Sequence, residues 1–121
     1  MSVSSVVDGR WAVHRREREA LQALAKIDSA EVIPILTRKL DSPIREFRYL
    51  AAEALWPRGY KRSVRVFISD LRSDDREIRK WADRRLEKLT GITSDYWYGD
   101  PESDREKNVR WWEAWLTKQK R

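Results

Sequence analysis

The stretch FRYLAAEALWPRGY, residues 47–60, indicates the fold class of this chain. Its apolar residues return at the spacing of one face of an α-helix, which predicts an amphipathic helix. The residues on that face are Phe47, Leu50, Ala51, Ala54 and Leu55. We expect the helix to end at Pro57, which cannot continue it, and at Gly59, which suits the left-handed position after a helix.

The same pattern recurs at an interval of 31 residues. The positions that this interval relates are Ala20, Ala51 and Ala82, and, four residues on, Leu24, Leu55 and Leu86. The preceding helix also matches, in the pairs Ile33 with Val64, Leu36 with Phe67, and Leu40 with Leu71. Amphipathic helix pairs that repeat in this way bury their apolar stripes by stacking side by side. We therefore predict that residues 20, 51 and 82 lie where helices cross closely.

The expected architecture is all-α, a short right-handed α-solenoid of three antiparallel helical hairpins with six helices. Capping residues and apolar spacing place the helices at about 11–27, 30–40, 43–56, 61–71, 75–90 and 105–118. A flexible N-terminal segment, residues 1–10, precedes a single domain, residues 11–121. The expected repeats cover about 11–41, 42–72 and 73–118, and the third contains a loop at 91–103 and a capping helix at 105–118.

Residues 47–55 resemble the first helix of the HEAT-repeat family, whose pattern is V-R-x-x-A-A-x-A-L, and residues 78–82 repeat its start. Residues 31–36 resemble the second helix of that family, including its proline. The resemblance covers roughly residues 12–90 and implies a fold more than a function. The first copy departs from the family pattern at Arg16, which suits an end of the stack that meets water.

The HEAT resemblance also implies a ladder of arginines beside the interhelical turns. Arg48 and Arg79 stand at the ladder position, where such arginines bind acidic groups and turn carbonyls of neighbouring repeats. The expected acidic partners are Asp41, Asp74 or Asp75.

The C-terminal segment is similar to a closing module that follows some bacterial HEAT repeats. The similarity lies in Leu-Thr-Gly at 89–91, Tyr-Gly-Asp-Pro at 98–101 and the tryptophan-rich residues 111–115. It implies a Trp-rich C-terminal capping helix, and the same tryptophans could instead form a binding surface.

Composition argues against several classes of function. The chain of 121 residues has no cysteine and a single histidine, His14, which disfavours thiol chemistry and histidine-based metal sites. No nucleophile–base arrangement or glycine-rich phosphate loop is evident, and a HEAT-like DNA glycosylase needs a larger cleft than three hairpins form. We expect no enzyme and no cofactor. Without a visible signal peptide or membrane span, the expected location is cytoplasmic.

The expected binding surface is the inner face that the second helices of the hairpins line. The residues of this face that do not belong to the buried apolar stripe include Arg38, Arg62, Arg65 and Arg72. The net charge is +6, and no acid stands between residues 54 and 69. The first hypothesis is a protein–protein interaction scaffold whose partner carries an acidic segment, and the alternative is a nucleic-acid-binding module. Solvated cations without a ligand would give the same pattern, and a homodimer stays open.

Overall fold

The computed structural model describes the backbone of residues 3–99 and 101–119 and the side chains of residues 14–98 and 101–119. Within these ranges the chain is helical and contains no strand. The α-helices are α1 (Val3–Ala25), α2 (Ile33–Lys39), α3 (Arg45–Leu55), α4 (Arg65–Asp70), α5 (Arg76–Thr90) and α6 (Arg105–Thr117). The 3₁₀ helices are η1 (Ala30–Val32), η2 (Trp56–Arg58), η3 (Lys61–Val64), η4 (Trp97–Gly99) and η5 (Glu102–Asp104). The prediction of an all-helical chain with six helices is confirmed for these residues.

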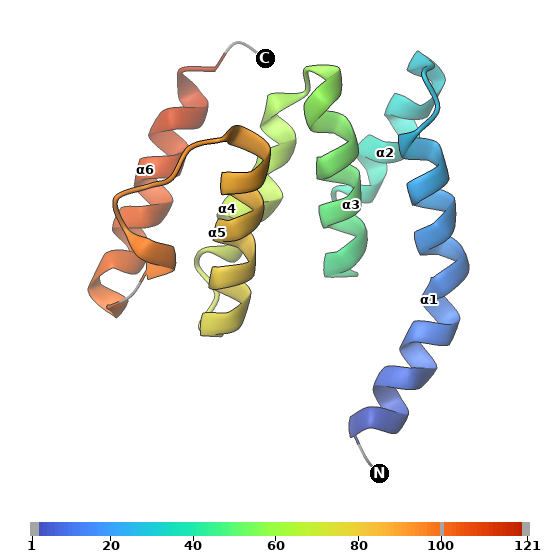
Figure 1. The fold of residues 1–121 in the computed structure, drawn as a ribbon, viewed down its shortest axis with the longest axis horizontal. Helices are drawn as coiled ribbons and strands as arrows, with labels where there is room; N and C mark the ends of the chain where they lie inside the picture. The colour runs from blue at the N-terminus through green and yellow to red at the C-terminus, as the bar shows by residue number, and fades with distance from the viewer. Residues whose placement is uncertain (1–2, 100, 120–121) are drawn as a thin grey trace.

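The helices stand side by side, from α1 at one end of the molecule to α6 at the other (Figure 1). Helix α3 lies between α1 and α2 on one side and α4 on the other, and α4 contacts both α5 and α6. None of the helices in the described ranges has the length and apolar character needed to cross a bilayer.

Two hydrophobic clusters meet at α3. The first contains Leu21, Val32, Leu36, Phe47, Ala54 and Leu55, and joins α1, η1 and α2 to α3. The second contains Tyr49, Ala52, Val64, Phe67, Ile68, Leu71, Ala82, Leu86, Val109, Trp112 and Leu116, and joins α3 to the helices that follow. Because α3 is apolar over a broad arc, it packs on its neighbours on both sides at once.

The helix ends follow the local signals of the sequence. The Ser29 hydroxyl accepts a hydrogen bond from the Glu31 N–H at 3.2 Å, at the start of η1. Gly59 and Gly91 adopt the left-handed conformation with φ of 91° and 77°, which a glycine adopts without steric cost. The first helix differs from the prediction, since it begins at Val3 and not near residue 11. No proline interrupts residues 3–10, so the helix continues through a segment that we expected to be flexible.

The predicted close crossings hold at two of the three repeat positions. Ala51 and Ala82 are fully buried, but Ala20 is exposed. The prediction for Ala20 is wrong because α1 is the first helix of the row, so no described helix covers its outer side. The 31-residue pattern identifies the equivalent positions correctly. It does not predict which helices surround a position at the end of the row.

The two ladder arginines bind the turns of their own copies. Arg48 Nη1 donates to the Ser42 carbonyl at 2.7 Å, and Arg79 Nη1 donates to the Ser73 carbonyl at 2.8 Å. The expected turn carbonyls are confirmed, but each lies six residues upstream in the same copy and not in a neighbouring repeat. Among the described residues, no hydrogen bond or ion pair joins Arg48 to Asp41.

The loop after α5 folds back onto that helix. The Tyr98 N–H donates to Asp83 Oδ2 at 2.6 Å, and Arg79 Nε donates to the Tyr98 carbonyl at 3.1 Å. These contacts hold Tyr98 at φ 31°, a conformation that is rare for a residue with a side chain. The side chain of the neighbouring Trp97 is 73% exposed, so most of its ring is in contact with solvent.

Helix α6 closes this end with aromatic side chains. Trp112 is fully buried, and its ring lies 5.0 Å from that of Trp111 and 5.6 Å from that of Trp115. Trp115 also stacks on Trp56, which follows α3, with ring centroids 6.0 Å apart. The helix therefore packs on residues from both the middle and the end of the row.

Candidate functional site

A groove with a volume of about 580 Å³ lies between α4 and α6. We call it the α4–α6 groove, and the residues that line it are Arg62, Arg65, Ile68, Ser69, Arg72, Glu113, Leu116 and Thr117. Residues of η3, α4 and the turn after α4 form one wall, and residues of α6 form the other. Ile68 and Leu116 are 3% and 7% exposed and belong to the second hydrophobic cluster, so the groove has an apolar base between polar walls.

The spacing of the sequence places the arginines on this wall. The buried stripe of η3 and α4 is formed by Val64, Phe67, Ile68 and Leu71. Positions 62, 65, 69 and 72 follow one another at intervals of three, four and three residues, which places them on a shared helix face. That face is the one left free when the apolar stripe is buried.

Arg62 and Arg65 are exposed at the groove. Among the described residues, neither guanidinium group has a hydrogen bond or an ion pair. Two positive charges three residues apart on one helical face repel each other weakly, and an anion between them would relieve that repulsion.

Arg72 is held by two acids of α6. Its Nη2 lies 3.1 Å from Glu106 Oε1 and 3.2 Å from Glu113 Oε1, and its Nε donates to Glu106 Oε2 at 3.4 Å. The hydrogen bond with Glu106 raises the pKa of the Arg72 guanidinium and lowers the pKa of the Glu106 carboxyl. The charge of Arg72 is therefore largely balanced within the molecule.

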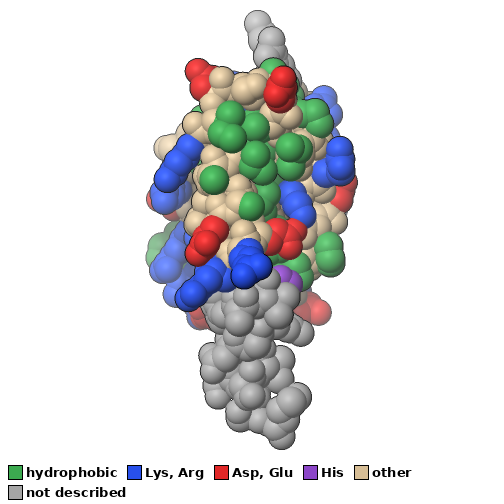
Figure 2. Space-filling view, turned by 90° about the vertical axis from the view of Figure 1, so that its right-hand side faces the viewer, with side chains coloured by type: hydrophobic (Ala, Val, Ile, Leu, Met, Phe, Trp, Pro, Cys, Tyr) green, Lys and Arg blue, Asp and Glu red, His purple; other side chains and the backbone are tan. Residues whose placement is uncertain are grey.

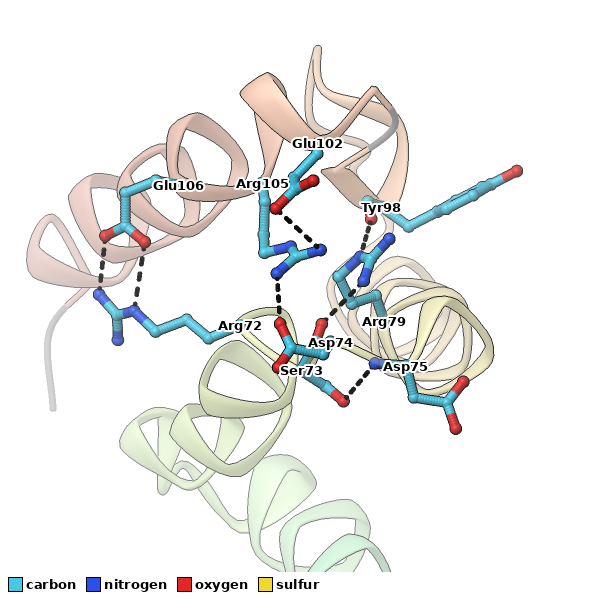
Figure 3. Close-up of polar contacts among 9 residues, drawn as sticks. All are labelled: Arg72, Ser73, Asp74, Asp75, Arg79, Tyr98, Glu102, Arg105 and Glu106. Carbon is cyan, nitrogen blue, oxygen red and sulfur yellow. Dashed lines mark hydrogen bonds and ion pairs between the residues drawn. The ribbon is translucent and has the colours of Figure 1, made fainter.

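A second ion pair fixes α6 beside the turn that follows α4 (Figure 3). Arg105 Nη1 lies 2.8 Å from Asp74 Oδ1, and Glu102 Oε1 lies 3.9 Å from Arg105 Nη2. Together with the contact between Arg72 and Glu106, this places the first two residues of α6 beside the turn that follows α4. The second wall of the groove is thus positioned by charged contacts as well as by the tryptophans.

The structure separates Arg38 from the other three predicted residues. Arg38 lines a different hollow of about 480 Å³, together with Glu17, Lys39 and Asp41. Lys39 and Glu17 form an ion pair there, and the charges of the hollow are mixed. Of the four predicted arginines, Arg62, Arg65 and Arg72 therefore line one groove, and Arg38 lines another hollow.

Arg58 also lies in the segment between residues 54 and 69 that contains no acid, but its guanidinium group binds the end of α1. Its guanidinium donates to the carbonyls of Ile27 at 2.7 Å, Ala25 at 3.1 Å and Ser29 at 3.4 Å. These carbonyls lie at and just after the C-terminus of α1, where the helix leaves acceptors unpaired. Arg58 thus caps α1 from the next helix pair and does not add to the groove.

Sequence reasoning missed the α6 wall. It assigned α6 to capping, and Glu113 and Thr117 were not singled out as binding residues. The loop after α5 is rich in acidic residues, whereas residues 54–69 contain none. This contrast in charge was a partial signal that acids of the C-terminal segment meet the arginines. Which acid meets which arginine depends on the path of the loop, and helix periodicity does not encode that path.

Comparison of the chain with protein-family models, with curated proteins and with solved structures finds no match. Among the described residues, no group of three histidine, aspartate or glutamate side chains is placed to hold a metal ion.

Proposed function

We propose that this protein is a non-enzymatic interaction scaffold that binds an acidic segment of a partner protein in the α4–α6 groove. In this proposal the helices form a short right-handed α-solenoid of the HEAT type, with α1–α2, α3–α4 and α5–α6 as its three antiparallel hairpins. The 31-residue recurrence and the equivalent contacts of Arg48 and Arg79 support this arrangement.

The observation that carries the proposal is the pair of uncompensated arginines above an apolar base. Arg62 and Arg65 line the same groove as the buried side chains of Ile68 and Leu116. An acidic peptide with apolar residues between its carboxylates matches both features, because guanidinium groups bind carboxylates in a fork geometry. The volume also falls within the roughly 300–1,000 Å³ that is usual for ligand pockets.

The charge of the far wall favours a peptide over nucleic acid. Glu113 lines the groove and Glu106 stands beside it, and both pair with Arg72, so the uncompensated positive charge is limited to Arg62 and Arg65. The mixed charge around Arg38 likewise gives no extension of the basic surface along the row. A nucleic-acid binder needs a basic track that follows several phosphates, whereas a short acidic peptide needs only two or three cations.

Fluorescence anisotropy with a labelled peptide of alternating Glu and Leu, at low salt, tests the proposal. We expect saturable binding by the full chain, weakened at least about tenfold in Arg62→Glu/Arg65→Glu, because two attractive contacts become repulsive. The matched control is Arg84→Glu/Lys88→Glu, which makes the same change of charge at two exposed positions of α5. The control should bind like the wild type.

Labelled single-stranded DNA and RNA form the second arm of the experiment. If they bind more tightly than the peptide, and their affinity falls steeply with salt, the nucleic-acid alternative holds. Equal loss of peptide affinity in both double variants would show that only net charge matters, and would overturn the assignment of the groove.

A further inference from the structure

The two walls of the α4–α6 groove offer different hydrogen-bonding groups to a ligand. Arg62 and Arg65 carry exposed guanidinium groups, which act only as donors. The residues that α6 contributes to the lining are Glu113, Leu116 and Thr117. The Thr117 hydroxyl donates its proton to the Glu113 carbonyl at 2.9 Å, so only the lone pairs of the hydroxyl oxygen remain available. A ligand that spans the groove therefore meets donors on one wall and acceptors on the other.

The Glu113 carboxylate has an oxygen that is not used within the molecule. Its Oε1 lies 3.2 Å from Arg72 Nη2, and the side chain is 50% exposed. Among the described residues, Glu113 Oε2 has no hydrogen bond or ion pair. A carboxylate has about four acceptor positions, so Glu113 can bind a cationic group of a ligand without losing its contact with Arg72.

Arg72 is held in place by Glu106 without the help of Glu113. Its Nε and Nη2 both reach the Glu106 carboxylate, at 3.4 and 3.1 Å, in the fork arrangement that orients a guanidinium group (Figure 3). The hydrogen bond from Arg72 and the charge of Arg110 both lower the pKa of Glu106. Glu106 is thus balanced by two cations outside the lining of the groove, and Glu113 is the acid that α6 contributes to that lining.

Other charged surfaces of the molecule are arranged differently. At the α1 end, acidic and basic side chains lie interspersed around the apolar ones (Figure 2). In the hollow beside Arg38, Lys39 and Glu17 bind each other. In the α4–α6 groove, by contrast, no ion pair of the described residues joins Arg62 or Arg65 to an acid. The opposite charges of the groove are therefore available to a ligand.

We propose that the partner segment, whose binding in this groove is the function proposed above, is bipolar: an acidic side chain binds Arg62 and Arg65, and a basic side chain binds Glu113. The apolar residues between them then cover Ile68 and Leu116, which form the base of the groove. Glu113 is in this way a specificity-determining residue. It attracts a segment with a base at the matching position and disfavours one that is acidic throughout.

The positions along the wall set the spacing of the two charges. Arg65 and Arg72 stand seven residues apart, which corresponds to about 10 Å along a helical path, and Glu113 contacts Arg72. An extended peptide covers that length in about three residues. The expected segment therefore has its basic residue about three positions from its acidic residue.

Fluorescence anisotropy at low salt with labelled peptides tests the bipolar ligand. The probes have the sequence Leu-Glu-Leu-Leu-X-Leu, in which X is Lys, Gln or Glu, and the reversed sequences cover the opposite chain direction. In the direction that binds better, we expect the lysine probe to bind the wild type at least about tenfold more tightly than the glutamate probe, with glutamine between them. The net charge of +6 by itself favours the glutamate probe, so a preference for lysine requires a local acid.

Substitutions at position 113 assign that preference to a residue. Glu113→Lys should reverse the order of the three probes, and Glu113→Gln, which keeps the size of the side chain, should bring them within about twofold of one another. Glu19→Lys is the matched control, because it makes the same change of charge at an exposed position of α1, and it should keep the wild-type order. Circular dichroism should show equal helix content in all four proteins, since Glu106 still holds Arg72.

The outcomes separate this inference from the function on which it rests. If the wild type binds the peptide of alternating Glu and Leu but shows no preference for lysine among the three probes, the bipolar ligand is refuted and the acidic one stands. A preference for lysine that survives in Glu113→Gln would equally refute the role of Glu113. Absence of binding to every peptide would overturn both proposals.

Discussion

The two ends of the helix row differ in how the 31-residue unit stops. At the α1 end, the unit keeps an apolar outer side, and Ala20 and Ala23 are exposed. At the other end, α5 carries Asp83 where α3 carries the buried Ala52, and the closing loop and α6 cover the helix. The outer side of a terminal repeat is thus suited to solvent when its side chains are polar. It is suited to packing against a further helix when they remain apolar.

The largest effect is expected where the closed end is most buried. Trp112→Ala should lower the free energy of unfolding by about 3–5 kcal/mol, because it removes a fully buried ring from the second hydrophobic cluster. Trp97→Ala removes the same side chain at a 73% exposed position and should change stability by less than about 0.5 kcal/mol. Urea unfolding followed by far-UV circular dichroism measures both. Similar losses in the two variants would mean that α6 does not close the row.

Equivalent alanines of the repeat allow a direct comparison of its middle with its open end. Ala51→Leu and Ala82→Leu should each destabilise the fold by about 1–3 kcal/mol, because the added carbons have no space in a helix crossing. Ala20→Leu should stay within about 0.5 kcal/mol of the wild type, since that position is exposed. Thermal unfolding followed by circular dichroism measures all three variants. A large loss at position 20 would show that its outer side is occupied in the single chain.

The smallest effect concerns the polar contact at the closed end. Burial raises the pKa of the Asp83 carboxyl, and the hydrogen bond from the Tyr98 N–H opposes this only in part. The folded chain therefore binds this proton more tightly than the unfolded chain. The contribution of Asp83 to the free energy of unfolding thus falls as pH rises from about 4 through the raised pKa.

Asp83→Asn keeps an acceptor for the Tyr98 N–H and removes the charge. Relative to the wild type, this variant should gain stability as the pH rises through that window, and urea unfolding at several pH values measures the gain. Asp95→Asn, which removes an exposed charge from the loop, is the control. A wild type and an Asp83→Asn variant with parallel pH profiles would refute the role of this carboxyl.

Local sequence signals predicted most of the fold. The left-handed glycine at 59 and the buried leucines at 55 and 86 lie where helix periodicity and capping chemistry place them. The start of α1 and the exposure of Ala20 were not predicted. Both concern an end of the repeat, where a residue's surroundings depend on neighbours that a periodic pattern does not specify.

The candidate site was predicted only on one wall. Arg62, Arg65 and Arg72 could be predicted because they are charged residues that remain on the helix surface once its buried apolar stripe is assigned. That assignment needs only the local sequence. The binding of Arg58 to carbonyls at the end of α1 and the contact of Glu113 with Arg72 are tertiary contacts between residues 31 to 41 positions apart. The charged residues are evident from the sequence, but the tertiary fold determines which of them form ion pairs and hydrogen bonds.

The double engagement of Arg72 by Glu106 and Glu113 has a thermodynamic consequence for α6. This helix both seals the row and forms one wall of the groove, so a ligand that spans the groove also holds α6 in place. By linkage, such a ligand should slow amide hydrogen exchange in α6. The expected factor is the one by which ligand binding shifts the equilibrium between undocked and docked α6 toward the docked helix. Occupancy of the groove and order of the terminal helix are then two readouts of a single equilibrium.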